Sequence, residues 1–183
     1  MKNKYLAFIF IALVGMHHMS AQEAPTLPQP VKEHEWLQQF IGEWESETQV
    51  FMDPNNPLKG TGSETVRSLG GFWIVSTGKG EMAGSNMEYV MTLGYDPAKK
   101  KYVGVWADSM TSHLWNMEGS VDESGKVLTM ESTGPCPMRP GQLSKFRDVT
   151  EFKSKDHRTF TSYIQNEDGE WTPTVKGEAR RKK

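Results

Sequence analysis

Asp108, Ser109 and His113 are the residues of this sequence whose types and spacing could do chemistry. A carboxylate beside a histidine can act as an acid–base pair, and Ser109 would complete a nucleophilic triad. No Gly-x-Ser-x-Gly elbow surrounds the serine. The competing interpretation is that Asp108 and Ser109 satisfy backbone groups in a tight turn. Asp108 and His113 are therefore the catalytic candidates, and whether the chain is an enzyme stays open.

Histidine and cysteine, the side chains that most often bind transition metals, are few in this sequence. Beyond residue 21 the histidines are His34, His113 and His157, and no pair has a metal-ligand spacing such as His-x-x-x-His. The one cysteine, Cys136, lies between two prolines in a loop that we expect to be exposed, and it could pair between chains in an oxidising compartment. A single axial haem ligand from His113 or His157 is the one cofactor arrangement to consider. We predict no metal and no cofactor, because a lone histidine is more often structural.

Composition narrows the class of protein further. The chain has 183 residues, with 21 Lys and Arg against 23 Asp and Glu, for a net charge of −2. This length suits one domain, and the charge gives no electrostatic reason to expect nucleic acid as a partner. Hydrophobic residues make up 36% of the chain and include six tryptophans, enough to build a core.

The first residues resemble an export signal rather than part of the fold. Lys2 and Lys4 precede an apolar stretch from Tyr5 to Met16, and small residues follow at Ser20 and Ala21. This order is typical of a secretory signal peptide, and the stretch is shorter than the roughly 20 residues of a membrane span. We predict a signal peptide over residues 1–21 and export to the periplasm or the medium, with an uncleaved anchor as the alternative.

A proline-rich linker is expected over residues 22–32, and the folded domain over residues 33–183. Removing residues 1–21 takes away two lysines and no acidic residue, so the charge falls from −2 to −4. No membrane span remains in this mature chain, and we expect it to be a monomer.

The domain reads as one short helix followed by strands. Apolar residues at helical spacing predict a helix over Val31–Ile41, which Gly42 ends. Alternating residues between turn sequences predict the strands Glu43–Phe51, Gly62–Leu69, Phe72–Met82, Met87–Tyr95, Lys101–Asp108, His113–Val121, Lys126–Ser132, Gln142–Lys153, His157–Gln165 and Trp171–Arg181.

Short connections between the strands make neighbours antiparallel, and a sheet of nine or ten such strands tends to curl and close. We therefore predict an all-β fold, a single antiparallel up-and-down barrel of about nine or ten strands with a short N-terminal helix. A two-sheet sandwich is the alternative.

The interior of such a barrel would be largely aromatic. If alternate residues face inward, the walls combine apolar surface with a few polar groups, as small-ligand sites do. A core filled by its own side chains is the alternative. The wall candidates are Trp73, Met87, Tyr89, Met91, Trp106, Asp108, His113 and Trp115.

Three groups of residues carry a resemblance to a known family. They are His34-Glu35-Trp36-Leu37 with Gly42-Glu43-Trp44, then Gly94-Tyr95-Asp96 with Lys101-Tyr102-Val103, and Trp106-Ala107-Asp108-Ser109. Together they resemble the family called domain of unknown function 1579, over roughly residues 33–182. The helix followed by Gly42 and Trp44 also resembles the opening of lipocalin-like barrels. That resemblance implies that Trp44 packs at the closed end beneath Arg181, as structural closure rather than ligand binding.

The resulting functional prediction is an exported barrel that binds a small hydrophobic or amphipathic molecule. Two alternatives stay open: an enzyme that uses Asp108 and His113 on a small substrate at the barrel mouth, or a filled barrel that acts in the envelope by protein contact.

The signal peptide makes a direct prediction. Protein purified from its own host should begin at Gln22, because cleavage is expected after the small residue Ala21. Native mass spectrometry would give the mass of the processed chain, its assembly state and any retained ligand. An intact N-terminus would contradict the prediction of cleavage.

Overall fold

The computed structural model describes residues 27–51, 53, 55–82 and 84–183. The predicted signal peptide and the first part of the predicted linker lie outside the described residues. None of the helices in the described part of the chain is long and apolar enough to cross a bilayer.

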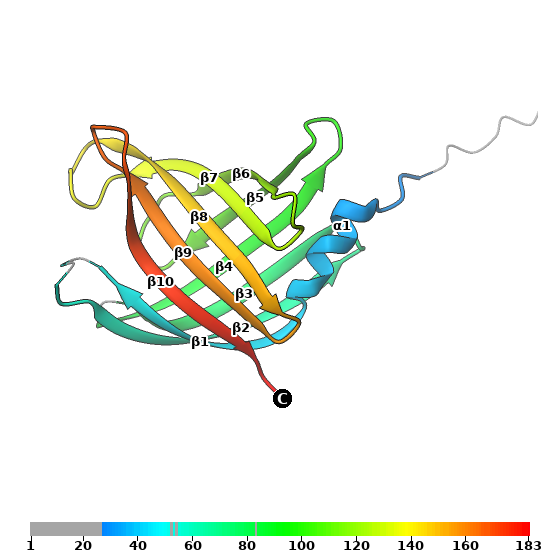
Figure 1. Ribbon diagram of the computed structural model, residues 1–183, viewed down its shortest axis with the longest axis horizontal. Helices are drawn as coiled ribbons and strands as arrows, with labels where there is room; N and C mark the ends of the chain where they lie inside the picture. Colours follow the sequence, from blue (N-terminus) through cyan, green and yellow to red (C-terminus); the bar gives the residue numbers. More distant parts are fainter. Residues whose placement is uncertain (1–26, 52, 54, 83) are drawn as a thin grey trace, which may run out of the picture.

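One short helix precedes ten strands (Figure 1). The helical segment consists of α1 (Lys32–Leu37) and a 3-10 turn, η1 (Gln38–Phe40), where the sequence predicts a helix. The strands are β1 (Gly42–Val50), β2 (Leu58–Leu69), β3 (Trp73–Met82), β4 (Ser85–Asp96), β5 (Lys101–Asp108), β6 (Trp115–Val121), β7 (Val127–Pro135), β8 (Leu143–Ser154), β9 (His157–Gln165) and β10 (Trp171–Arg181).

The strands form a closed barrel in which each one pairs antiparallel with its neighbours in the sequence, and β1 pairs with β10 to close the sheet. The predicted antiparallel barrel is therefore confirmed, and the two-sheet sandwich is excluded. Closure leaves no free sheet edge, so every strand has two hydrogen-bonded neighbours.

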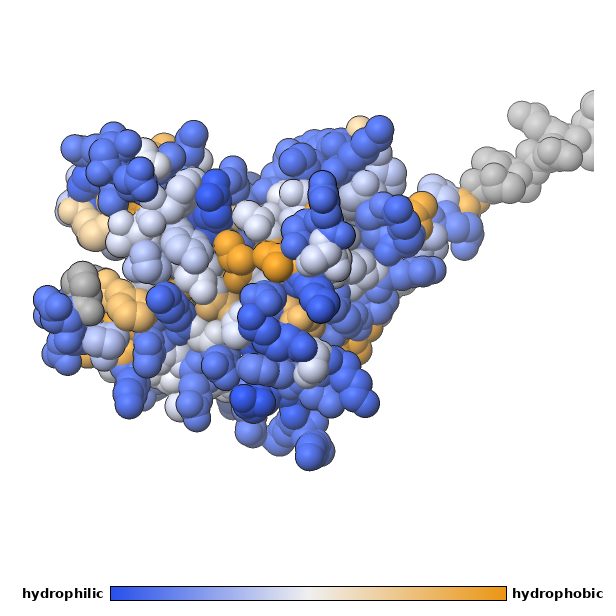
Figure 2. All heavy atoms as spheres, viewed as in Figure 1, coloured by the Kyte–Doolittle hydropathy of each residue, from blue (hydrophilic) through white to orange (hydrophobic). Residues whose placement is uncertain are grey.

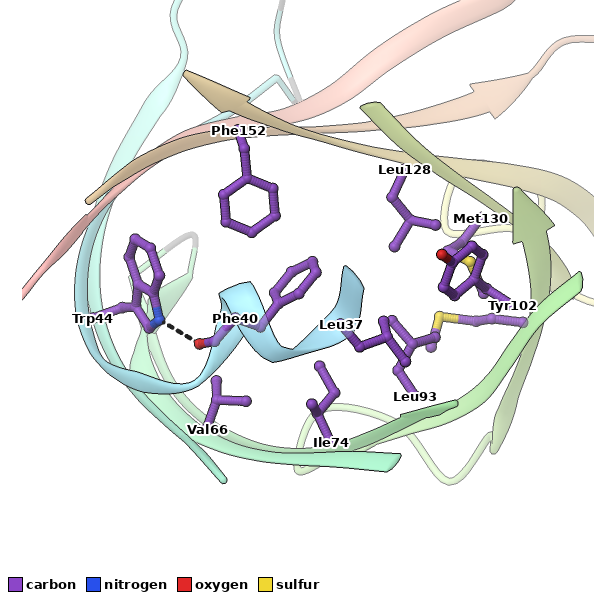
Figure 3. Close-up of a cluster of buried hydrophobic side chains, with 11 residues drawn as sticks. Leu37, Phe40, Trp44, Val66, Ile74, Leu93, Tyr102, Leu128, Met130 and Phe152 are labelled. Carbon is purple, nitrogen blue, oxygen red and sulfur yellow. Dashed lines mark hydrogen bonds between the residues drawn. The ribbon is translucent and has the colours of Figure 1, made fainter. Parts of the chain in front are cut away.

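One end of the barrel is plugged and the other is open. The helical segment crosses the end where the β2–β3, β4–β5, β6–β7 and β8–β9 turns lie, while the β1–β2, β7–β8 and β9–β10 loops lie at the opposite end (Figure 1). Leu37 and Phe40 of the helical segment are buried to 0% and 2% exposure and join the core cluster of the closed half (Figure 3).

Hydrogen bonds connect the helical segment, residues 32–40, which we call the plug, to the strands and turns around it. The buried His34 accepts the Val31 backbone N–H at Nδ1 (3.0 Å), so its ring proton sits on Nε2 and is donated to the Tyr95 carbonyl (3.1 Å). Trp36 Nε1 donates to the Gly125 carbonyl in the β6–β7 turn (2.7 Å). The plug is thus fixed to β4 and to the β6–β7 turn by side chains that also pack against the core.

Trp44 and Arg181 lie next to the plug, as the lipocalin resemblance implies. Trp44 Nε1 donates to the Phe40 carbonyl at 2.7 Å (Figure 3). The Arg181 guanidinium lies 4.3 Å from the Trp44 ring centre and donates to the Gln39 carbonyl (3.0 Å) and the Ile41 carbonyl. These groups satisfy carbonyls at the end of the helical segment that no helix bond reaches.

Gly42 has φ +128°, which favours glycine, and a Cβ at this position would overlap the Arg181 guanidinium. Gly42 therefore has two roles. Its backbone conformation turns the chain from the plug into β1, and its missing side chain leaves room for Arg181.

Arg181 should contribute measurably to stability. The change Arg181→Lys keeps the charge but removes the planar donors that reach the Gln39 and Ile41 carbonyls, so we expect a loss of about 1–3 kcal/mol in the free energy of unfolding. Urea unfolding measures it. Arg180→Lys is the matched control, because the Arg180 side chain is 68% exposed, and it should change stability by less than about 0.5 kcal/mol. Equal effects of the two changes would contradict the role of Arg181 in closure.

Candidate functional site

The open half of the barrel interior retains accessible surface. Phe160 is directly opposite Thr150 on β8 and Gly177 on β10 and faces the interior, yet it is 36% exposed. A large aromatic residue in a filled core would be close to fully buried. In Figure 2 the surface is indented between the β7–β8 and β9–β10 loops above and the β1–β2 loop below. Phe160 is therefore only partly covered by its neighbours, although Ile164, on the same face of β9, is fully buried.

Glycines on neighbouring strands let aromatic rings lie against the wall. A Cβ on Gly78 would overlap the ring of Tyr89, its direct partner on β4. Tyr89 in turn stacks on Trp106 of β5, with ring centres 4.0 Å apart and an interplanar angle of 18°. The two rings therefore form a face-to-face stack on the inward side of β4 and β5, with Tyr89 reaching over Gly78 of β3.

A second aromatic group lies on β6 and β8. Gly134 of β7 accommodates the Trp115 ring in the way that Gly78 accommodates Tyr89. Trp115 meets Phe146 edge to face at 4.9 Å, and His113 meets Trp115 edge to face at 4.8 Å. Each aromatic group thus includes one ring that lies over a glycine of a neighbouring strand.

A buried ion pair lies between this space and the plug. Arg158 of β9 pairs with Glu64 of β2, and each side chain is 10% exposed. The Ser76 hydroxyl also donates to Glu64. The Arg158 guanidinium lies 4.6 Å from the centre of the Trp44 ring, so Trp44 contacts two guanidinium groups. The sequence analysis did not identify this pair. Arg158 lies two residues before Phe160 on β9, so the alternation of the strand could have placed both side chains on the inward face.

Tyr89 and Asp148 are ionisable groups of the interior whose pKa values are shifted. Burial raises the pKa of Tyr89 above its usual range, and the Glu64 carboxylate adds to this effect. Burial raises the pKa of Asp148, in the middle of β8, to about 6, although a hydrogen bond with the Ser162 hydroxyl acts in the opposite direction. The neutral forms of both groups are favoured because their charged forms lose contact with water.

The structure brings most of the predicted wall residues together. Met87, Tyr89 and Met91 share the inward face of β4, while Trp106 and Trp115 are direct partners on β5 and β6. The prediction that Trp73 lines the interior is wrong, because this residue lies on the outer face and is 37% exposed. Its ring covers Gly94, its direct partner on β4, while the next residue, Ile74, is fully buried on the inward face.

Asp108 and His113 are not brought together as a hydrogen-bonded pair. The Asp108 carboxylate accepts the Trp106 Nε1–H (2.9 Å) and the backbone N–H groups of Met110 (2.8 Å) and Thr111 (3.0 Å). His113 Nε2 lies 3.2 Å from the Thr133 carbonyl oxygen. Both oxygens of Asp108 are thus engaged in organising the β5–β6 loop and in orienting an aromatic wall residue.

Ser109 is likewise engaged with the backbone. Its hydroxyl oxygen accepts the Glu88 backbone N–H at 3.0 Å. The arrangement of Asp108 and Ser109 corresponds to the turn interpretation of these residues rather than to a triad.

The other residues considered for a cofactor lie apart from the interior. His157 Nε2 contacts Glu178 at 3.1 Å, and the residue next to it, Arg158, is the one that faces inward. Within the described ranges, no three His, Cys, Asp or Glu side chains are arranged to hold a metal ion.

Cys136 is buried, at 3% exposure, where we expected an exposed loop. Burial acts to raise its pKa, but the Arg139 guanidinium, the Ser144 hydroxyl and backbone amides lower it more, to about 7. Arg139 reaches over the thiol to donate to Ser144 at 2.8 Å. Pairing of Cys136 between chains would require this loop to open, because the same side chains cover the sulfur.

Comparisons with known proteins agree with this architecture. The family model described as "Protein of unknown function (DUF1579)" matches residues 29–181. No curated protein matches the sequence of this chain.

Two solved structures resemble the barrel. Rv2717c from M. tuberculosis has a TM-score of 0.60 and 10% sequence identity, and the likeness covers 85% of this chain and 100% of that one. The S-type phycobiliprotein lyase CPES from Guillardia theta has a TM-score of 0.52 and 14% identity, covering 81% and 92% of the two chains. At such identities the likeness shows the fold alone.

Asp148 should cost stability when it is ionised. Its pKa is about 6 in the folded protein and about 4 in an unfolded chain. The folded state therefore binds more protons between these values, and stability falls as pH rises from about 4 to about 6. Asp148→Asn lacks this loss, so it should stabilise the protein at pH 7.5 by on the order of 1–2 kcal/mol.

Urea unfolding at pH 4 and pH 7.5 tests this expectation, and the gain should largely vanish at pH 4. Glu123→Gln removes one exposed carboxylate and should show no such pH-dependent gain. A gain of equal size at both pH values would mean that the charge of Asp148 is not its cause.

Proposed function

The chain belongs to the DUF1579 family, and from this starting point we propose that it is an exported barrel that binds a small hydrophobic or amphipathic molecule in the open half of its interior. Export rests on the signal-like sequence of residues 1–21. Binding rests on the geometry of the barrel.

The observation that carries the proposal is the exposure of Phe160. This ring faces the interior of a closed barrel, yet more than a third of its surface is accessible. Exposed aromatic surface inside a barrel is costly in water. A bound apolar molecule would cover it and recover that free energy, which gives the site a physical reason to be occupied.

The composition of the walls supports the same function. Ligand sites are mostly apolar with a few convergent polar groups. Here the stacked Tyr89–Trp106 pair and the Trp115–Phe146 pair supply the apolar surface, while Asp148 supplies a half-buried polar group. The rings are fixed by contacts with glycine or with each other, so binding would order few side chains.

The mouth of the barrel carries several exposed apolar side chains among its polar ones. Large hydrophobic side chains that are at least 41% exposed lie in or beside the loops of the open end, and they are Leu58, Met110, Leu114, Met138 and Leu143. A rim of this kind lowers the cost of moving an apolar molecule from its source into the interior.

Catalysis has weaker support. Asp108 and Ser109 are engaged with backbone groups of the β5–β6 loop and of β4, and no side chain among the described residues is placed to accept a proton from His113. One structural neighbour is named a lyase, but a likeness at 14% identity supports a shared fold rather than a shared reaction. We therefore propose a binding protein rather than an enzyme.

A cavity-filling substitution tests the proposal. Thr150 faces the interior opposite Phe160, so Thr150→Trp should occupy the accessible space and weaken binding of the neutral fluorescent probe N-phenyl-1-naphthylamine by at least about tenfold. Titration of probe fluorescence measures the affinity, and circular dichroism verifies the fold.

The matched control is Thr161→Trp, which introduces the same ring on the outer face of the neighbouring strand. It should leave the affinity unchanged. No binding of the probe to the wild-type protein, or an equal effect of the two substitutions, would argue against an interior site.

A further inference from the structure

Asp148 is the one interior carboxyl that pairs with no cation and caps no turn among the described residues. It lies in the middle of β8, directly opposite Met130 of β7 and Ser162 of β9. Its pKa has two causes, burial and the Ser162 hydroxyl, and no charged side chain of the described residues is among them. A carboxyl in such a place is destabilising unless something else compensates for it.

The other charged groups of the interior leave the balance negative. On the open side of the plug the ionisable groups that face inward from the strands are Glu64, Arg158, Asp108, Asp148 and the Tyr89 hydroxyl. His113 packs on Trp115 in the β5–β6 loop, and Arg139 of the β7–β8 loop pairs with Glu167. Glu64 and Arg158 neutralise each other, and the phenol of Tyr89, whose pKa burial raises further, is uncharged at neutral pH. Asp108 and an ionised Asp148 therefore remain, with no free cation among the described residues of this half.

We propose that the molecule bound in the barrel carries a cationic nitrogen, a protonated amine at the end or within an apolar body, and that Asp148 is its partner. This inference rests on the proposed binding function. The ammonium would lie against Asp148 and the Ser162 hydroxyl, while the apolar part would cover Phe160 and the aromatic walls.

The same arrangement disfavours an anionic ligand. A fatty acid entering this space would need a free guanidinium or ammonium group, but the Arg158 guanidinium is already held by Glu64 and packed over Trp44 and Phe40. Bringing a second carboxylate near Asp148 would add like-charge repulsion in a region of low dielectric constant.

Protonation of Asp148 gives the pairing a pH dependence. Affinity for an amine should rise with pH through about 6, as the carboxyl loses its proton. Met130 and Ser162, which face Asp148 from β7 and β9, do not titrate. The Glu64–Arg158 pair is neutral as a unit, and Asp108 lies at the open end where β5 finishes. His113 lies in the loop that follows, where its Nε2 contacts the Thr133 carbonyl.

Three ligands with one alkyl chain test the inference: dodecylamine, dodecan-1-ol and dodecanoate. Isothermal titration calorimetry below their micelle concentrations gives the affinities. At pH 7.5 we expect the amine to bind about tenfold more tightly than the alcohol, and dodecanoate to bind more weakly than the alcohol. At pH 5 the advantage of the amine over the alcohol should shrink several-fold.

The variants separate the charge of Asp148 from its shape. Asp148→Asn should remove the preference for the amine while leaving alcohol binding intact, and Asp148→Glu should retain part of the preference. Glu123→Gln, which removes a surface carboxylate, should change nothing.

Two outcomes would overturn the inference, and they differ from failure of the proposed function. If the alcohol binds but the amine has no advantage over it, or if Asp148→Asn keeps that advantage, the barrel binds ligands without using Asp148. If none of the three ligands binds, the proposed binding function fails and the inference fails with it.

Discussion

The position of Trp44 between the plug and two arginines is the constraint on which the rest of the structure depends. Its indole donates to the Phe40 carbonyl, and the guanidinium groups of Arg181 and Arg158 both lie within 4.6 Å of the ring centre. Arg181 of the last strand donates to the Gln39 carbonyl of the plug, and Arg158 forms an ion pair with Glu64 of β2. The helical segment is thereby held in one half of the barrel, where its apolar side chains fill the core. The other half is left to aromatic rings that line the wall.

The two halves of the barrel differ in this way, and the difference places the residues that stabilise the fold apart from those proposed to bind a ligand. Most of the residues that are almost completely buried, such as Leu37, Trp44 and Ile74, lie in the closed half, while Ile164 is buried to the same degree near the open end. The open half contains an exposed Phe160 and an ionisable Asp148, which both cost free energy in the unoccupied protein. Such costs are tolerated where a ligand can offset them. The glycines at positions 78 and 134 make room for the rings of Tyr89 and Trp115, which a Cβ at either position would overlap.

Much of the fold could be predicted from the sequence because it follows from local patterns. Alternation and turn residues gave the number of strands, and the Gly42-x-Trp44 spacing indicated the closed end. The direction of Trp73 could not be predicted, because a tryptophan at the start of a strand fits either face and the deciding partner, Gly94, is on another strand. The Glu64–Arg158 pair joins residues 94 positions apart, and the role of Asp148 depends on which groups surround it in space. The burial of Cys136 depends in the same way on Arg139 and Ser144.

The central claim is that the open half of the barrel is an accessible interior rather than a filled core. A crystal structure of the protein soaked with 12-bromododecan-1-ol tests this claim most directly, because the anomalous signal of bromine marks the position of the alkyl chain. We predict a bromine peak inside the barrel, with the chain in contact with Phe160 and the Tyr89–Trp106 stack. A peak confined to the outer groove lined by Trp73, Val103 and Val105, with side chains packed across the interior, would contradict the account.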